Sequence, residues 1–146
     1  MQTFLPYYDY RKSARVLDYK RLGEQRVEVK QILNALRKPN YGWKNHPAVR
    51  MWRGYEYALA SYGIECCVEW LQRGYKDSLL HEFHDVRNQI HVELIEQGKL
   101  IEYYPPWLRE MQLQLSHQSN LLRKYPEYYK HHFAVHDDLP YYWPNQ

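Results

Sequence analysis

The sequence predicts an all-α fold of three to four helices, followed by an irregular C-terminal tail that is rich in aromatic residues. Apolar residues recur every three or four positions over long stretches, as they do on the buried face of a helix. Prolines and glycines separate these stretches, at places where they would begin or end helices. No stretch alternates apolar and polar residues as a half-buried strand does. With 146 residues, the chain is expected to form a single domain, residues 1–146.

The first predicted helix runs from Ser13, a residue type that favours the N-cap position, to about Leu36. Its apolar face carries Leu22, Val29, Leu33 and Leu36, with Ile32 at the edge. Arg21, Glu24 and Glu28 share the neighbouring flank of the same helix. The pattern therefore predicts a helix with one buried face and a charged flank beside it.

A loop of sequence PNYGWKNH precedes the second predicted helix, which runs from Pro47 to Arg73. Proline suits the first helical position, and a glycine follows the last one. The expected inward stripe begins with Val49, Trp52, Tyr55 and Leu59. Gly54 and Gly63 lie inside this helix, where a glycine costs about 1 kcal/mol relative to alanine. We therefore expect both glycines to allow close packing against another part of the backbone.

Two further helices are predicted in the second half of the chain. An acidic helix spans residues 78–97 and is ended by Gly98. A fourth helix spans residues 107–124 after a pair of prolines, with Met111, Leu115 and Leu122 directed inward. The tail, residues 125–146, has seven aromatic residues and three prolines but no helical period, so it is expected to be irregular.

Charge is distributed unevenly along the chain. Residues 1–53 contain twelve Lys and Arg against four Asp and Glu, a balance of +8, whereas the remaining residues contain eight against thirteen, a balance of −5. A basic half of this kind indicates an anionic partner such as nucleic acid. Sixteen tyrosines also favour a surface on which bases could stack.

The two cysteines, Cys66 and Cys67, are adjacent, a spacing that rarely forms a disulfide and cannot by itself build a zinc site. They are expected to be reduced core residues of a cytoplasmic protein, associated with the nucleoid when bound to DNA. No apolar run is long enough to span a membrane. His81 and His84 lack a third clear ligand, so we expect no metal site and no cofactor.

A phosphate-binding surface is predicted where the second helix begins. Lys44, His46, Arg50 and Arg53 gather near a helix N-terminus, whose free N–H groups and positive dipole end attract anions. The alternative interpretation is that the aromatic residues of this stretch belong to the core and the arginines are merely solvated.

Several motifs together resemble the pyrimidine-dimer DNA glycosylase (endonuclease V) family. They are the loop GWKNHP before an aromatic helix, the helix end CVEWLQRGYK, and the segment LSHQSNLLRKYPEYYKHHF. The resemblance covers roughly residues 1–75 and 105–133, and leaves the acidic segment 77–102 unmatched. The ending DDLPYYWP is similar to a bacterial branch of this phage-type family.

The resemblance implies a glycosylase and abasic-site lyase acting on damaged double-stranded DNA. In that family the free amine at the start of the chain attacks C1′ of the damaged nucleotide, and an imine and β-elimination follow. An α-amine ordinarily has a pKa of about 7.7–8.0, so a sizeable fraction is neutral at pH 7, unlike a lysine. A glutamate on the first helix then stabilises positive charge at the sugar and transfers protons.

Two residues are candidates for that glutamate. Alignment on the first helix favours Glu28, and Glu24 is the alternative one turn earlier. Arg21 and Arg26 are then expected to contact phosphate or sugar. The competing interpretation is that both glutamates only form i,i+4 ion pairs on the helix surface.

The start of the chain departs from the phage pattern, in which the initiator methionine is removed and a threonine amine reacts. Residue 2 is glutamine here, which normally blocks that removal, so the reactive amine is predicted to be that of Met1. A lysine nucleophile, or glycosylase action without strand cleavage, is the alternative.

Aromatic and imidazole groups near the C-terminus complete the predicted DNA-binding surface. His117 is predicted to face DNA, and Tyr125, Tyr128 and Tyr129 to stack on an unpaired base or the lesion. The alternative is that these tyrosines pack the tail onto the helices. Two rival functions also stay open: a non-catalytic nucleic-acid-binding relative, and a helical scaffold that binds protein through the acidic segment and the aromatic tail. For the DNA-repair enzyme, no obligate protein partner is evident in the sequence.

Overall fold

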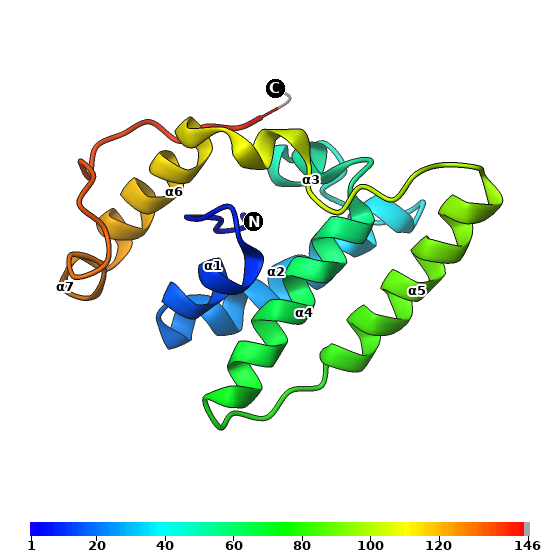
Figure 1. The fold of residues 1–146 in the computed structure, drawn as a ribbon, viewed down its shortest axis with the longest axis horizontal. Helices are drawn as coiled ribbons and strands as arrows, with labels where there is room; N and C mark the ends of the chain where they lie inside the picture. The colour runs from blue at the N-terminus through cyan, green and yellow to red at the C-terminus, as the bar shows by residue number, and fades with distance from the viewer. Residues whose placement is uncertain (145–146) are drawn as a thin grey trace.

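A computed structural model describes residues 1–144, and all of its regular elements are helices (Figure 1). The elements are α1 (Tyr10–Val16), α2 (Tyr19–Arg37), α3 (Pro47–Trp52), α4 (Glu56–Gln72), α5 (Leu80–Glu96), the 3-10 helix η1 (Pro106–Arg109), α6 (Met111–Lys124) and α7 (Pro126–Tyr129). This part of the chain contains no strand. The predicted all-α class is therefore confirmed, although the elements are shorter and more numerous than expected.

Helix α4 lies at the centre of the fold and packs against α1, α2 and α5. Gly63 of α4 lies where these helices meet: a Cβ added there would be 2.7 Å from Val29 Cγ1 and 3.0 Å from the ring of Phe83. The absence of a side chain at Gly63 thus lets both α2 and α5 approach α4. The expected close packing at this glycine is confirmed, but against side chains rather than backbone.

The first predicted helix is two helices, so the prediction of a single element was wrong. Helix α1 is capped by Asp9, whose carboxylate accepts a hydrogen bond from the Lys12 N–H at 2.9 Å. Ser13, the predicted N-cap, is instead buried and bonded to the backbone of Tyr7. The chain turns at Leu17 and Asp18, where the Asp18 N–H donates to the Tyr129 hydroxyl at 2.9 Å.

The long helix predicted from Pro47 is also divided. Pro47 begins α3 and His46 caps it, as expected, but α3 ends at Trp52 and α4 begins at Glu56. Gly54 lies in the break with φ +89°, a conformation that glycine adopts without steric cost. No atom lies within 4 Å of a Cβ added at Gly54, so the expected close packing there was wrong.

The predicted fourth helix starts as the 3-10 helix η1 and continues as α6 after a turn at Glu110. Met111, predicted to point inward, is 64% exposed, and Leu115 is half-buried. Leu113, Leu121 and Leu122 supply the buried face instead. The tail is irregular as predicted, except for the one-turn helix α7.

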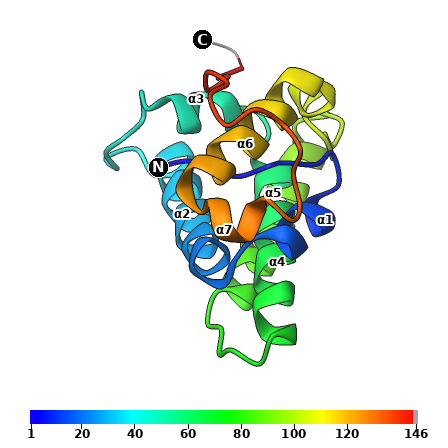
Figure 2. The same cartoon turned by 90° about the vertical axis from the view of Figure 1, so that its left-hand side faces the viewer.

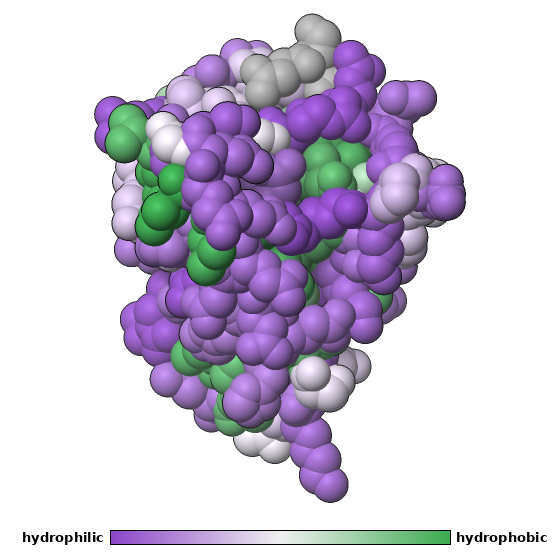
Figure 3. Space-filling view, turned by 90° about the vertical axis from the view of Figure 1, so that its right-hand side faces the viewer, coloured by the Kyte–Doolittle hydropathy of each residue, from purple (hydrophilic) through white to green (hydrophobic). Residues whose placement is uncertain are grey.

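The acidic third helix is confirmed as α5, and Gly98 follows it with φ +66°. Its outer side is mainly hydrophilic, with apolar groups scattered in small areas (Figure 3). Val92, Ile95 and Leu100 are the apolar residues most exposed in this region. Among the described residues, no helix is both long and apolar enough to cross a membrane.

Candidate active site

The first six residues form an extended segment that passes between α6 and the helices of the core (Figure 2). Gln25 of α2 holds this segment from one side: its Oε1 accepts the Phe4 N–H at 2.8 Å, and its Nε2 donates to the Gln2 carbonyl at 3.0 Å. The Tyr62 hydroxyl of α4 lies 2.7 Å from both the Phe4 carbonyl and Gln25 Oε1. All of these bonds are buried or partly buried, so they fix the register of the segment.

Side chains from α3 and α6 hold the same segment from the other side. The Trp52 indole N–H donates to the Thr3 hydroxyl at 3.1 Å, and the Leu5 N–H donates to His117 Nδ1 at 2.8 Å. Side chains from four helices therefore hold residues 2–5 in place, and the positions of these residues determine where the Met1 amine lies.

Glu28 on α2 faces the start of the chain, close enough for the Met1 amine and the Gln2 backbone N–H to affect its pKa. Burial raises the pKa of Glu28, while the positive Met1 amine and the Gln2 backbone N–H oppose the rise. Glu28 Oε2 is buried and has no hydrogen-bond partner among the described residues. A buried carboxylate oxygen without a partner is costly, so its retention indicates a group reserved for a ligand or for chemistry.

Glu24, the alternative, lies one turn earlier and is exposed. Its charge is close enough to contribute to the raised pKa of Glu28. Of the two candidates, Glu28 is the one whose pKa responds to the Met1 amine, whereas Glu24 lies at the surface.

His46 also lies within electrostatic reach of the Met1 amine. Its Nδ1 accepts the Ala48 N–H at 3.0 Å and so caps α3. Burial and the nearby Met1 amine both lower the pKa of His46, so its ring stays neutral to a lower pH than an ordinary histidine. The ring also meets Trp43 and Trp143 edge to face, each at 6.1 Å between ring centroids.

Arg21 and Arg26, predicted to contact DNA, are both engaged by carboxylates. Arg21 pairs with Asp18 at 3.2 Å. Arg26 pairs with Asp77, whose side chain is 1% exposed, and its guanidinium lies 4.9 Å from the Trp70 ring centroid. Asp77 also accepts the N–H groups at the start of α5. Arg26 therefore ties α2 to α5 and is not free to clamp a phosphate.

Replacing Arg26 by alanine is expected to lower the free energy of unfolding by about 3 kcal/mol, because it leaves the buried Asp77 charge unpaired. Lys30→Ala is the matched control on the same helix. The Lys30–Glu82 pair is 43% exposed on both sides, so its loss should cost less than about 1 kcal/mol. Urea denaturation followed by circular dichroism measures both, and equal losses would contradict the assignment.

The predicted phosphate-binding residues separate into two groups. Lys44 Nζ donates to the carbonyls of Ala35 (2.9 Å) and Lys38 (2.7 Å), so it satisfies the free carbonyls at the end of α2. Arg53 donates to the Lys44 carbonyl at 2.8 Å. Arg50 is exposed on α3 and is the member of the set best placed to reach DNA.

The four C-terminal candidates also separate. His117 is fully buried, and burial lowers its pKa to about 3, so the prediction that it faces DNA was wrong. Tyr129 is fully buried as well, and its hydroxyl donates to the Asp18 carboxylate. Tyr125 is 43% exposed and stacks on the half-buried Tyr128 with ring centroids 5.7 Å apart. Of the four C-terminal candidates, Tyr125 and Tyr128 are the two that keep ring surface available for a base.

Sequence reasoning missed Gln25, the residue that does most to hold the N-terminal segment. The signal was present, because Gln25 is a polar residue on the apolar face of its helix, between Leu22 and Val29. Its burial is satisfied entirely by bonds to residues 2–4 and Tyr62.

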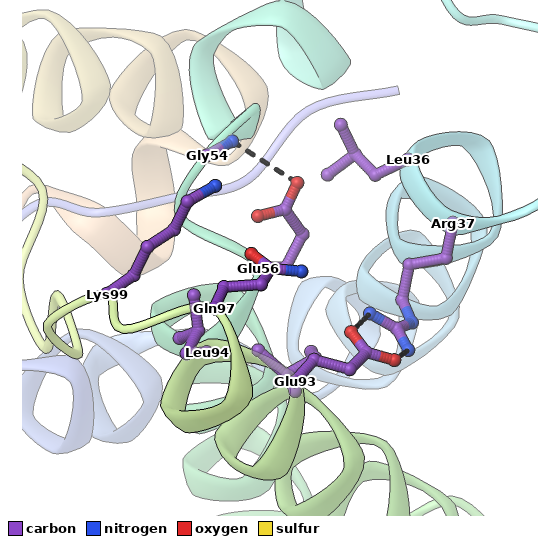
Figure 4. Close-up of a pocket in the computed structure, with 9 residues that line it drawn as sticks. Leu36, Arg37, Gly54, Glu56, Glu93, Leu94, Gln97 and Lys99 are labelled. Carbon is purple, nitrogen blue, oxygen red and sulfur yellow. Dashed lines mark hydrogen bonds and ion pairs between the residues drawn. The ribbon is translucent and has the colours of Figure 1, made fainter.

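A cavity of about 480 Å³ lies elsewhere, between the ends of α2 and α5 and the start of α4 (Figure 4). Arg37 and Glu93 form a two-bond ion pair at its wall, and Glu56 accepts the Gly54 N–H at 3.2 Å. Its lining includes neither Met1 nor Glu28. In the part of the chain that is described, no three His, Cys, Asp or Glu side chains gather in a geometry that could hold a metal ion.

No curated protein and no solved structure is similar enough to the chain to match it. A family model for pyrimidine dimer DNA glycosylase matches residues 1–83, which include Met1, Glu28 and the loop before α3. Because this match covers more than half of the 146 residues, the chain belongs to the pyrimidine dimer DNA glycosylase family, a family of DNA-repair glycosylases.

Proposed function

We propose that the protein removes damaged, pyrimidine-dimer-like bases from double-stranded DNA and then cleaves the backbone at the resulting abasic site. The observation that carries this proposal is a half-buried carboxylate, Glu28, whose pKa responds to the charge of the Met1 amine at the start of a segment held by four helices. Membership of the glycosylase family supports the first step. The second step rests on the chemistry of an amine within electrostatic reach of a carboxylate.

The reaction begins with the neutral Met1 amine of a chain that starts at this residue. Its nitrogen bonds to C1′ of the damaged nucleotide as the C1′–N glycosidic bond breaks, and the base leaves with the bonding electrons and takes up a proton. The amine then loses a proton, the sugar ring oxygen gains one, and the ring opens to an imine at C1′.

Strand cleavage follows from the imine, because it acidifies the hydrogens on C2′. A base removes one of them, the C3′–O bond breaks, and the 3′ phosphate departs with its electron pair. Water then hydrolyses the imine and restores the amine. We assign to Glu28 the role of giving the proton to the ring oxygen and accepting the one from C2′, because it has a buried, unpartnered oxygen and lies within electrostatic reach of Met1.

The raised pKa of Glu28 suits this double role. A carboxyl group whose pKa is shifted upward by burial keeps its proton to a higher pH than usual, so it can act as both acid and base closer to neutrality. The Met1 charge opposes the shift, so Glu28 is a stronger acid while the Met1 nitrogen is positively charged and a stronger base while that nitrogen is neutral.

DNA binding is supported by the basic N-terminal half, by the exposed Arg50, and by the Tyr125–Tyr128 pair. Positive charge neutralises phosphates without regard to sequence, and a lesion that already weakens stacking costs less to expose. We also infer a cytoplasmic location from the two free adjacent cysteines. Association with the nucleoid would follow from the proposed DNA binding.

Borohydride trapping tests the proposal. The untagged protein is incubated with UV-irradiated, abasic and undamaged duplexes, and sodium borohydride reduces any imine to a stable crosslink. We expect crosslinks on the irradiated and abasic duplexes that map to Met1. Binding without a crosslink or strand cleavage on any duplex would contradict the proposal and favour the non-catalytic nucleic-acid-binding alternative.

A further inference from the structure

Trp43, in the loop between α2 and α3, combines two unusual properties. Its side chain is 66% exposed, although a large indole is ordinarily buried. Its φ of +69° is the single positive value found at a non-glycine residue of the described chain. A bulky residue rarely adopts this conformation, and such strained residues concentrate at functional sites.

The loop that carries Trp43 is held in place by its neighbours. The His46 N–H donates to the Trp43 carbonyl at 3.0 Å, and Lys44 Nζ bonds to two carbonyls at the end of α2. Arg53 donates to the Lys44 carbonyl from the other side. The exposed ring is therefore presented by a braced loop, which limits the conformational entropy lost when the ring binds.

Trp43 is linked to the Met1 amine through His46. Its ring meets the His46 ring at 70°, with 6.1 Å between centroids, so the two do not stack and the indole face stays open. His46 in turn lies close enough to the Met1 amine for its pKa to respond. Figure 2 shows the loop projecting from the body of the molecule on the side where the N-terminus lies.

The elements that flank the loop carry exposed positive charge. Lys38 lies where α2 ends and the loop begins, and Arg50 lies one turn into α3, where the loop has ended. Cations in the elements that flank a projecting aromatic residue can hold phosphates while the ring enters the base stack.

We propose that Trp43 inserts into the duplex and stacks in the space left by the extruded nucleotide, which keeps that nucleotide against Met1 and Glu28. This inference rests on the proposed function and adds the group that holds the nucleotide out of the helix. Trp43 acts on the neighbouring base pairs of the duplex, and Met1 and Glu28 act on the sugar.

A comparison of double-stranded with single-stranded DNA separates this role of Trp43 from others. Trp43→Ala, Trp43→Phe and wild type are compared on an abasic site in a duplex and in the same single strand, by single-turnover cleavage. Trp43→Ala should slow duplex cleavage about fivefold to 150-fold, the range spanned by stacking one base on an aromatic ring. It should leave the single-strand rate unchanged, because a single strand has no gap to fill, and Trp43→Phe should retain most of the duplex rate.

Tyr19→Ala is the matched control, because Tyr19 is 63% exposed and lies outside this loop. It should match wild type on both substrates. The inference would be overturned if Trp43→Ala lowered the cleavage rate equally on duplex and single strand, or lowered it on neither. A fall confined to the UV-irradiated duplex would instead indicate that Trp43 holds the damaged base, and would overturn it too.

A binding measurement keeps the inference separate from the chemistry. Wild type should bind a duplex containing tetrahydrofuran, an uncleavable abasic analogue, more tightly than an intact duplex, and Trp43→Ala should lose this preference. If wild type shows the preference and Trp43→Ala loses it, but wild type neither cleaves nor crosslinks, the proposed function fails and the stacking role of Trp43 stands. If wild type cleaves but Trp43→Ala keeps the preference, the role of Trp43 fails alone.

Discussion

Replacing Glu28 by glutamine is expected to slow cleavage of damaged duplex DNA by about 10²- to 10⁴-fold, the range associated with general acid–base catalysis. Glutamine keeps the size of the side chain but cannot carry or release the proton. Affinity for DNA should change little, because Glu28 lies half-buried within electrostatic reach of Met1 and not on the basic surface. Single-turnover cleavage and fluorescence anisotropy measure the two effects separately.

Glu24→Gln is the control for this experiment, since Glu24 is exposed one turn away on the same helix. It should cleave at close to the wild-type rate. Glu28→Gln should also unfold at a urea concentration no lower than wild type, because it removes a buried, unpartnered carboxylate oxygen. Cleavage that survives both substitutions would show that neither glutamate is the catalytic group.

Displacing the N-terminal amine is expected to have the second large effect. Two residues, Gly-Ser, added before Met1 in a chain whose new end is free would move the amine by up to about 7 Å. The bonds at Gln2, Thr3, Phe4 and Leu5 prevent the segment from sliding back to compensate. We expect strand cleavage to fall at least about 10²-fold and the borohydride crosslink to disappear, because reacting groups lose their alignment.

The same two residues added at the C-terminus serve as the control and should leave cleavage unchanged. DNA affinity of the extended chain should also stay near wild type, since the basic surface is untouched. A crosslink that persists in the chain extended before Met1, and maps to a lysine, would replace the α-amine by a lysine nucleophile.

Helical periodicity predicted the main helices because that signal is local. The acidic helix is the clearest case: an apolar stripe and a following glycine place α5 within two residues of the expected bounds. The prediction failed where distant residues decide the backbone. Leu17 and Asp18 interrupt the first helix. At this turn the Asp18 N–H donates to the hydroxyl of Tyr129, which lies 111 residues further along the chain.

The break at Gly54 is different, because its cause is local. An interior glycine was noted in the sequence but interpreted as a packing residue, whereas it supplies the positive φ that lets α3 end and α4 begin. Gly63, of the same residue type, proved to be a packing residue. Residue type alone cannot distinguish the two roles, because the difference lies in what surrounds the missing Cβ.

The sequence by itself determined the helical class, the basic N-terminal half, and the candidates Met1, Glu28 and Glu24. Only the tertiary structure showed that Glu28 is half-buried within electrostatic reach of the amine while Glu24 is exposed, and that Arg26, His117 and Tyr129 are engaged inside the protein. The physical reason is how far apart along the chain the interacting residues lie. Periodicity and charge act between neighbours along the chain, whereas the amine is positioned by bonds from Gln25, Trp52 and His117, on three separate helices, and these meet only after folding.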